Sequence, residues 1–293
     1  MIVYPYHIIG ESFCYKRIID AFKKFSPEKI TFTDNYSEAD TDILHVNGRR
    51  DQFYRIAEKS IKEGRKYIVA QYCLRSTQRK STQEWKWLWE NALLVWSYYD
   101  LNKMIREDGG SWQLNNFLHS PLGADENVFT MAETEKKFIA MTSGGLASID
   151  NESTREVASA ANILNKNVFH LGPNINLGAN VTYGHNINDN EIVSAYRASE
   201  YVCGLRRIEG FELPAVEGLF CGARPILFDR DHYRKWYEPW AEFIPESHPI
   251  KVNRKLIELF KCGARPVSQQ ERNEAVSIFG WNNVINNFWN KII

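Results

Sequence analysis

The segment 206–229 contains acidic and basic side chains that together could bind an anionic ligand rich in hydroxyl groups. Glu209 and Glu217 are eight residues apart, and their carboxylates can accept hydrogen bonds from hydroxyl groups. Because Pro214 stands between them and proline is favoured in the first turn of a helix, we expect a helix to begin there. The unpaired N–H groups and positive dipole end of such a helix suit a phosphate group. The segment therefore predicts a site for a phosphorylated ligand.

Three more residues of this segment fit the same site. Gly210 would let a ligand approach the backbone closely, because glycine has no side chain. Arg206 and Arg207 lie just upstream, and guanidinium groups can bind a diphosphate through paired N–H donors. We therefore expect the strand Tyr201–Leu205, then a binding loop, then the helix Pro214–Cys221.

Strand and helix patterns alternate along the chain and predict the elements that position this loop. In the first part of the chain, apolar runs predict five strands: Met1–Ile9, Lys29–Phe32, Asp42–Val46, Tyr67–Ala70 and Ala92–Trp96. Helical spacing of apolar residues predicts four helices: Phe13–Phe25, Phe53–Glu63, Gln83–Asn91 and Tyr99–Arg106. Pro121 and Gly123 mark a hinge, after which the pattern restarts. We expect an α/β protein with two halves, a cleft between them and an amphipathic helix over 281–293.

Composition and charge exclude several classes of protein. The 293 residues include 36 basic and 36 acidic side chains, which excludes a strongly basic nucleic-acid-binding protein for the chain as a whole. No apolar run reaches the ~18–20 residues of a membrane span, and the apolar start lacks the basic residues of a signal peptide. The five cysteines are scattered and form no C-x-x-C pair, which indicates free thiols in a reducing compartment. We expect a cytoplasmic protein without a transmembrane segment.

Residues 209–226 read E-G-F-E-L-P-A-V-E-G-L-F-C-G-A-R-P-I. They resemble the E-x7-E element of retaining glycosyltransferases with the GT-B fold, especially the large family 4, which usually reads E-G-F-G-L-P-x-x-E-A-x-x-x-G-x-P-V. Four further segments resemble landmarks of that family in the same order: Ser120–Phe129, His170–Gly172, Tyr183–Ile192 and Phe279–Val284. The C-terminal half is well covered, whereas the N-terminal half matches by pattern alone, through the loop at Gly10 after the first strand.

The resemblance implies two Rossmann-like domains of the GT-B fold. Residues 1–122 would bind the acceptor, together with the helix 281–293 that crosses back, and residues 123–280 would bind the donor. It implies transfer of a sugar from a nucleotide-diphosphate sugar, such as a UDP- or GDP-sugar, to an acceptor hydroxyl, with retention of configuration. The nucleotide sugar is then a co-substrate, and neither a cofactor nor an obligatory metal is expected.

The resemblance also assigns roles to individual residues. Glu209 would contact the donor sugar as a catalytic residue, and Glu217 would bind the ribose hydroxyls. The remaining donor contacts would come from Gly210, from the backbone of Phe211, Glu212 and Leu213, from the main chain near His185, and from the Gly10 loop.

The sequence departs from the family at two places. Glu212 replaces the family's second glycine and puts a charge beside the sugar. The Arg and Lys that usually hold the diphosphate are absent from the loop after the first strand of the second domain, where Ser143 and Gly144 stand. Their place would be taken by Arg155, Arg206 or Arg207, and the sequence leaves the choice open.

Candidates for the acceptor side lie in the N-terminal half. Arg75, Arg79 and Lys80 belong to a predicted loop after a strand, where they would meet an anionic acceptor. His45 ends another predicted strand and Glu11 follows the first, so both are candidates for catalytic roles at the ligand-binding edge of the sheet.

Three other patterns receive simpler interpretations. Trp85, Trp87 and Trp89 cannot all share one helix face, so we expect at least one ring to be exposed or in the cleft. The acidic triplets 40–42 and 229–231 look like metal motifs of a different glycosyltransferase fold, and we expect them to be solvated turn residues. The sequence C-G-A-R-P occurs at 221–225 and 262–266, and we interpret the match as chance.

Several alternatives remain for the acceptor and for the activity. A glycan or a glycolipid acceptor fits the resemblance, the latter with peripheral membrane contact. One alternative is a viral enzyme that glycosylates modified DNA bases in the host cytoplasm. The basic residues in 75–80 and the tryptophans support this alternative, whereas the zero net charge of the chain disfavours it. A nucleotide-sugar-binding protein without transferase activity and a two-domain epimerase are further alternatives.

Overall fold

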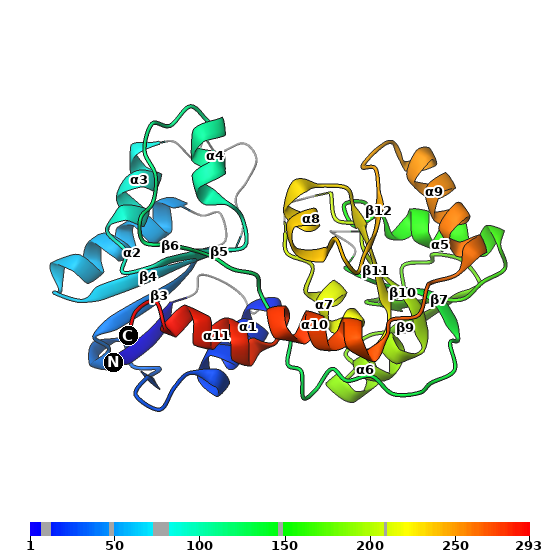
Figure 1. Cartoon of the computed structure of the whole chain (residues 1–293), viewed down its shortest axis with the longest axis horizontal. Helices are drawn as coiled ribbons and strands as arrows, with labels where there is room; N and C mark the ends of the chain where they lie inside the picture. The colour runs from blue at the N-terminus through cyan, green and yellow to red at the C-terminus, as the bar shows by residue number, and fades with distance from the viewer. Residues whose placement is uncertain (7–12, 47–49, 73–81, 146–148, 208–209) are drawn as a thin grey trace. The chain divides into compact units, whose positions relative to one another are not determined.

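We analysed a computed structural model, which describes residues 1–6, 13–46, 50–72, 82–145, 149–207 and 210–293 (Figure 1). The contacts between residues divide the chain into two compact units. Unit 1 consists of residues 1–122, 209–211 and 281–293, and unit 2 of residues 123–208 and 212–280. Each unit is described by itself below.

Unit 1 is built on a six-stranded sheet with the strand order β2-β1-β3-β4-β5-β6, in which every neighbouring pair is parallel. Its strands are β1 (Ile2–Tyr6), β2 (Thr31–Phe32), β3 (Thr41–Val46), β4 (Lys66–Gln71), β5 (Val95–Ser97) and β6 (Phe117–His119). Its helices are α1 (Phe13–Phe25), η1 (Tyr36–Glu38), α2 (Arg50–Lys62), α3 (Gln83–Glu90), α4 (Leu101–Glu107) and α11 (Trp281–Trp289). All residues of β3 are buried, as expected for a parallel strand covered on both faces.

Helix α11 completes the core of unit 1, although it follows unit 2 in the sequence (Figure 1). The rings of Phe22 on α1 and Phe288 on α11 are 5.0 Å apart and meet edge to face. The indole nitrogen of Trp289 donates a hydrogen bond to Ser26 Oγ at 2.6 Å. The predicted amphipathic helix over 281–293 therefore buries its apolar face against α1.

Unit 2 is built on a second six-stranded parallel sheet, with the order β12-β11-β10-β7-β8-β9. Its strands are β7 (Phe138–Ser143), β8 (Val168–Leu171), β9 (Val181–Gly184), β10 (Ser199–Gly204), β11 (Arg224–Phe228) and β12 (Glu242–Ile244). Its helices are α5 (Thr154–Ile163), α6 (Asp189–Arg197), α7 (Leu213–Phe220), α8 (Asp231–Tyr237), α9 (Pro249–Cys262) and α10 (Gln269–Phe279). The predicted α/β class with parallel sheets is confirmed in both units, whereas α8, β12, α9 and α10 were not predicted.

The two C-G-A-R-P sequences, interpreted above as a chance match, meet inside unit 2. The Arg224 side chain is 2% exposed and donates hydrogen bonds to the carbonyls of Arg265 and Pro266, at 2.7 and 3.0 Å. Both arginines also reach Glu271, at 3.2 Å from Arg224 and 2.8 Å from Arg265. The copies therefore form one contact that ties β11 to the connection between α9 and α10.

The acidic triplets differ from one another in burial. Asp40, Asp229 and Asp231 are exposed, in agreement with solvated turns. Asp42 is fully buried, so the prediction is wrong for this residue. Oδ2 of Asp42 accepts a hydrogen bond from Ser60 Oγ at 2.6 Å and lies 3.2 Å from the guanidinium of Arg65, and burial raises the pKa of Asp42 to about 6.

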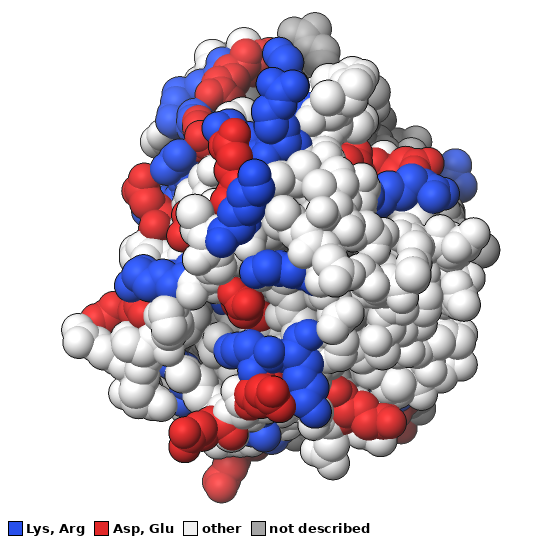
Figure 2. All heavy atoms as spheres, turned by 90° about the vertical axis from the view of Figure 1, so that its right-hand side faces the viewer, with Lys and Arg blue, Asp and Glu red and all other residues white. Residues whose placement is uncertain are grey.

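On the face of unit 2 shown in Figure 2, charges of both signs lie next to one another over one part, and a large part carries no charged side chain among the residues described. Some charged residues pair with another residue of the same helix; on α9, Lys255 and Glu258 lie 2.7 Å apart. Such exposed pairs contribute little to stability. In the part of the chain that the structure describes, no helix has both the length and the apolar composition needed to cross a membrane.

Candidate functional site

The connection from β10 to α7, together with α7 itself, carries most of the predicted donor-binding residues. Strand β10 ends at Gly204, and α7 begins at Leu213 with a proline in its first turn. The predicted helix start at Pro214 is thus one residue late. Because ligands of open α/β folds bind at the carboxyl ends of parallel strands, this connection lies where a ligand would bind to unit 2.

Glu217 on α7 is buried within unit 2, with 7% of its surface exposed. Its Oε2 accepts a hydrogen bond from the hydroxyl of Tyr196 on α6 at 3.0 Å. A buried carboxylate needs such a donor, because removing it from water is otherwise costly. The hydroxyl of Tyr196 therefore fixes the orientation of the Glu217 side chain.

Glu212, which stands where the resemblance expects glycine, is also buried. Its carboxylate accepts a hydrogen bond from Tyr233 Oη at 3.1 Å, and its carbonyl accepts one from Tyr237 Oη at 3.2 Å. Burial raises the pKa of Glu212, while the charge of Arg206 acts in the opposite direction. A Cβ atom at Gly204 would lie only 2.8 Å from Glu212 Cγ, so the glycine in β10 makes room for this side chain.

Arg206 lies between two carboxylates. Its Nη2 is 2.7 Å from Glu152 Oε1, and its Nε is 3.9 Å from Glu212 Oε1. The charge of Glu212 is the main influence that raises the pKa of Arg206, so the guanidinium stays positively charged. With 39% of the side chain exposed, Arg206 is both held in place and accessible to solvent.

The other two candidate arginines are placed differently. Arg207 is 22% exposed, donates a hydrogen bond to the carbonyl of Ser247 at 3.0 Å and lies 3.7 Å from Glu156. Its guanidinium also covers the ring of Phe228 at 5.2 Å, so Arg207 packs within unit 2. Arg155 is 56% exposed and pairs with the exposed Asp150 at 3.1 Å.

The loop after β7 lies beside the end of β8. Ser143 ends β7, and Gly144 follows with φ 145°, a conformation that favours glycine. A Cβ atom at Gly172 would lie 2.2 Å from the carbonyl oxygen of Gly144, so only glycine allows the two backbones to approach this closely. His185 follows β9 and is exposed.

Several predicted residues are not placed at this edge of unit 2. Phe211 groups with unit 1, where its ring lies 5.3 Å from that of Tyr98. His45 is 1% exposed, and its Nδ1 lies 2.7 Å from the hydroxyl of Tyr72. Gly210 is buried and also groups with unit 1, whereas Leu213 is buried as the first residue of α7 in unit 2. The following predicted residues lie outside the described part of the chain: Gly10, Glu11, Arg75, Arg79, Lys80 and Glu209.

The residues that hold the site together were not predicted. Glu152 precedes α5, and nothing in its neighbourhood in the sequence links it to Arg206. Tyr233 and Tyr237 are four residues apart on α8 and both are buried, a spacing that indicates one buried helix face. In the described ranges, no three His, Cys, Asp or Glu side chains gather as a metal site would require.

Comparisons with known proteins give structural matches only. No family model and no curated protein sequence matches the chain. The solved sucrose-phosphate synthase from Thermosynechococcus elongatus has a TM-score of 0.68 at 12% identity, covering 87% of this chain and 73% of that one. AviGT4, a glycosyltransferase involved in avilamycin A biosynthesis, has a TM-score of 0.68 at 9% identity, covering 99% and 96%. The lipopolysaccharide outer core galactosyltransferase WaaB has a TM-score of 0.66 at 11% identity, covering 99% and 98%.

At such low identities, the likeness concerns the fold alone. The matched proteins are glycosyltransferases of the GT-B fold, and the two six-stranded parallel sheets with their flanking helices match that architecture. The predicted fold class is confirmed, while membership of retaining family 4 stays a prediction. This chain therefore has the GT-B fold.

Proposed function

We propose that this protein is a glycosyltransferase that moves a sugar from a UDP- or GDP-sugar to an acceptor hydroxyl, with retention of configuration. A glycan or glycolipid is the proposed acceptor. The observation that supports this most is the connection between β10 and α7, which carries the E-x7-E resemblance at the carboxyl edge of a GT-B sheet. An accessible arginine, held by two carboxylates, stands in that connection.

Unit 2 is the proposed donor-binding domain, and unit 1 is the proposed acceptor-binding domain. Unit 2 contains Arg206, Glu212 and Glu217, as well as the exposed His185 after β9, which would lie near the base. Glu209 would contact the donor sugar, as the resemblance implies. The proposed reaction uses neither a cofactor nor an obligatory metal.

Among the three candidate arginines, we assign the diphosphate to Arg206. Arg155 is exposed and paired on the surface, and Arg207 is held by Ser247 and by the ring of Phe228. Arg206 is the one that combines a fixed position with an accessible guanidinium. Glu212, which differs from the family pattern, then acts as a positioning residue for Arg206.

The chemistry follows from this placement. When the bond between the sugar carbon and the diphosphate oxygen breaks, negative charge develops on the leaving diphosphate. A guanidinium that is already held in place stabilises this charge without reorganising during the reaction. The positive dipole end at the start of α7 acts in the same direction. The oxygen of the acceptor hydroxyl then forms the new bond to the sugar carbon, and its proton passes to the departing diphosphate.

The experiment is a donor screen by calorimetry and mass spectrometry with UDP-, GDP- and ADP-sugars. We expect one nucleotide class to bind, and a mass increase of one sugar on a glycan or glycolipid acceptor. Glu217→Gln should weaken nucleotide binding, while Tyr196→Phe, which removes only the hydroxyl that orients Glu217, should weaken it less. If no donor is bound or hydrolysed, the proposal is wrong; binding without any transfer would identify a non-catalytic nucleotide-sugar-binding protein instead.

A further inference from the structure

The three tryptophans of α3 fall into two groups. Trp85 and Trp89 are fully buried and stack on each other at 4.7 Å, so they belong to the core of unit 1. Trp87 lies on the other side of the helix and is half-buried. Its ring lies 4.5 Å from that of Tyr54 on α2, tilted by 42°. This aromatic pair stands at the surface, between α2 and α3.

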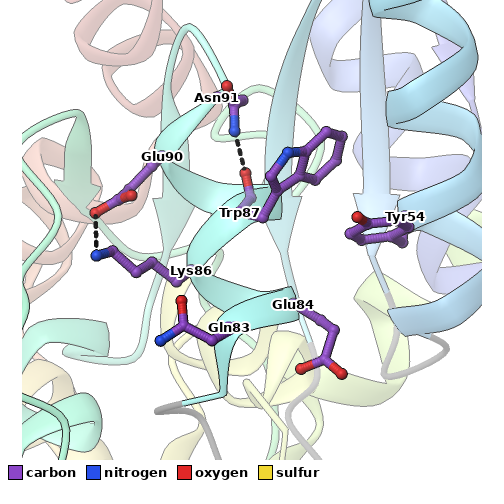
Figure 3. Close-up of a pocket in the computed structure, with 7 residues that line it drawn as sticks. All are labelled: Tyr54, Gln83, Glu84, Lys86, Trp87, Glu90 and Asn91. Atoms are coloured by element: carbon purple, nitrogen blue, oxygen red, sulfur yellow. Dashed lines mark hydrogen bonds and ion pairs between the residues drawn. The ribbon is translucent and has the colours of Figure 1, made fainter.

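A pocket of about 370 Å³ opens beside this pair (Figure 3). Trp87 and Tyr54 supply its apolar part. Its polar part comes from α3 and the residue after it: Gln83, Glu84, Lys86, Glu90 and Asn91. Figure 3 shows Trp87, Tyr54 and Glu84 toward one side of α3, Gln83, Lys86 and Glu90 toward the other, and Asn91 at the end of the helix. The pocket thus combines a flat apolar surface with amide and carboxylate groups.

The charges in this pocket restrict the ligand. Lys86 lies 3.8 Å from Glu90, so its ammonium group is partly neutralised. With Glu84, the lining contains two carboxylates and one ammonium group, which disfavours phosphates and nucleic acids. Asn91 is fixed, because its Nδ2 donates to the carbonyl of Trp87 at 2.8 Å. A ligand with apolar C–H faces and many hydroxyl groups matches this lining, whereas an anion does not.

The position of the pocket relates it to the ligand-binding edge of unit 1. In a parallel sheet, the helix that follows a strand begins near the carboxyl end of that strand. Gln83 and Glu84 form the first turn of α3, the helix that follows β4. The pocket therefore extends along α3 from its first turn, near the carboxyl edge of the sheet, to Asn91.

We propose that this pocket is a binding site for neutral linear oligosaccharides, with one sugar ring stacked on Trp87 and its hydroxyls bonded to Gln83 and Glu84. In the working protein it would hold part of an extended acceptor at a distance from the reacting hydroxyl. This last link rests on the proposed function, whereas saccharide binding at Trp87 does not.

The test measures binding of maltohexaose, cellohexaose and chitohexaose to the full chain by calorimetry and tryptophan fluorescence. We expect at least one of them to bind, and Trp87→Ala to weaken its binding about tenfold, the effect of one stacking contact. Trp87→Phe should recover part of the affinity. Trp236→Ala, at a half-buried tryptophan of α8 in unit 2, is the matched control and should bind as the wild type does.

A second variant protects the test against a folding defect at Trp87. Gln83 and Glu84 are exposed, so Gln83→Ala/Glu84→Ala should keep the thermal stability and still weaken oligosaccharide binding. The proposal is overturned if no hexasaccharide binds, or if Trp87→Ala and the double variant bind the sugars as the wild type does. It is also overturned if choline, a cation of the kind that aromatic rings bind, binds at Trp87 and the sugars do not. These readouts need no donor, so they stay informative if the protein transfers no sugar.

Discussion

Replacing Arg206 with methionine tests the assignment of the diphosphate. The guanidinium is 2.7 Å from Glu152 and 3.9 Å from Glu212, so it is positioned before any ligand arrives. A hydrogen bond between charged groups contributes ~1.5–3 kcal/mol. If Arg206 makes one such bond to the diphosphate, we expect Arg206→Met to weaken the binding of UDP or GDP by about 10- to 150-fold.

The same substitution also changes stability, because it leaves Glu212 without its neighbouring cation. Breaking a fully buried ion pair costs ~3–5 kcal/mol. Since 39% of the Arg206 side chain is exposed, solvent screening reduces this to about 1–2 kcal/mol. For a unit of this size, Tm should then fall by roughly 2–8 °C. Adding Glu212→Gln removes the charge left behind, keeps an amide oxygen that can accept from Tyr233 Oη, and should restore Tm without restoring nucleotide affinity.

Isothermal calorimetry with UDP and GDP measures the affinity, and scanning calorimetry measures Tm. Arg155→Met is the matched control: its side chain is exposed and paired only with exposed Asp150, so both quantities should stay unchanged. The reasoning is refuted if Arg206→Met binds nucleotide as tightly as the wild type while Arg207→Met loses it. In that case Arg207 would have to leave its contact with Phe228 to reach the ligand.

Three further predictions concern stability. Arg224→Met should lower the free energy of unfolding by ~3–5 kcal/mol in urea denaturation, because Arg224 is 2% exposed and holds several partners. Arg265→Met, at a side chain that is 63% exposed, should lower the free energy of unfolding by less than ~1 kcal/mol. Equal effects of the two substitutions would contradict this prediction. Burial acts to raise the pKa of Glu271, but hydrogen bonds from Ser268 and Arg224 outweigh it and hold the pKa at about 2, below its ordinary 4.5. The folded protein therefore gains stability above pH 4.5 that is lost as the pH falls from 4.5 towards 2, by about 1–2 kcal/mol after screening, and Glu271→Gln should remove this dependence in urea titrations at pH 7 and pH 3. Trp289→Ala should destabilise unit 1 by ~3–5 kcal/mol through the cavity it leaves, whereas Ser26→Ala, which removes only the partner of the indole nitrogen, should cost ~1–3 kcal/mol in the same measurement.

Most of the fold could be predicted because its strands are short apolar runs separated by amphipathic helices. The run at Asp42–Val46 predicted β3 almost completely, and the spacing around Phe22 predicted α1. The segment 230–280 was harder for physical reasons. Helix α10 buries only Ala275 and Phe279, and β12 is a three-residue strand at the edge of its sheet, so neither has a strong pattern. Helix α9 buries residues at intervals of four and could have been predicted from that spacing.

The site was predicted less completely than the fold. The sequence identified Arg206 as a candidate but could not choose among three arginines, because the choice depends on partners that are distant in the chain. Glu152 is 54 residues away from Arg206, and no local pattern reports a contact of that kind. The same holds for Gly204, whose missing side chain leaves space for Glu212.

The path of the chain through the two units has a consequence for synthesis in the cell. The first residues of unit 1 are translated before unit 2, but the surface of α1 around Phe22 stays uncovered until α11 is made, and α11 is translated after all of unit 2. The later-starting unit therefore has its whole sheet and all its helices before the earlier one can close its core. A nascent chain stalled before residue 281 would expose the α1 surface to chaperones and proteases. Synthesis of α11 and its packing on α1 would end that exposure.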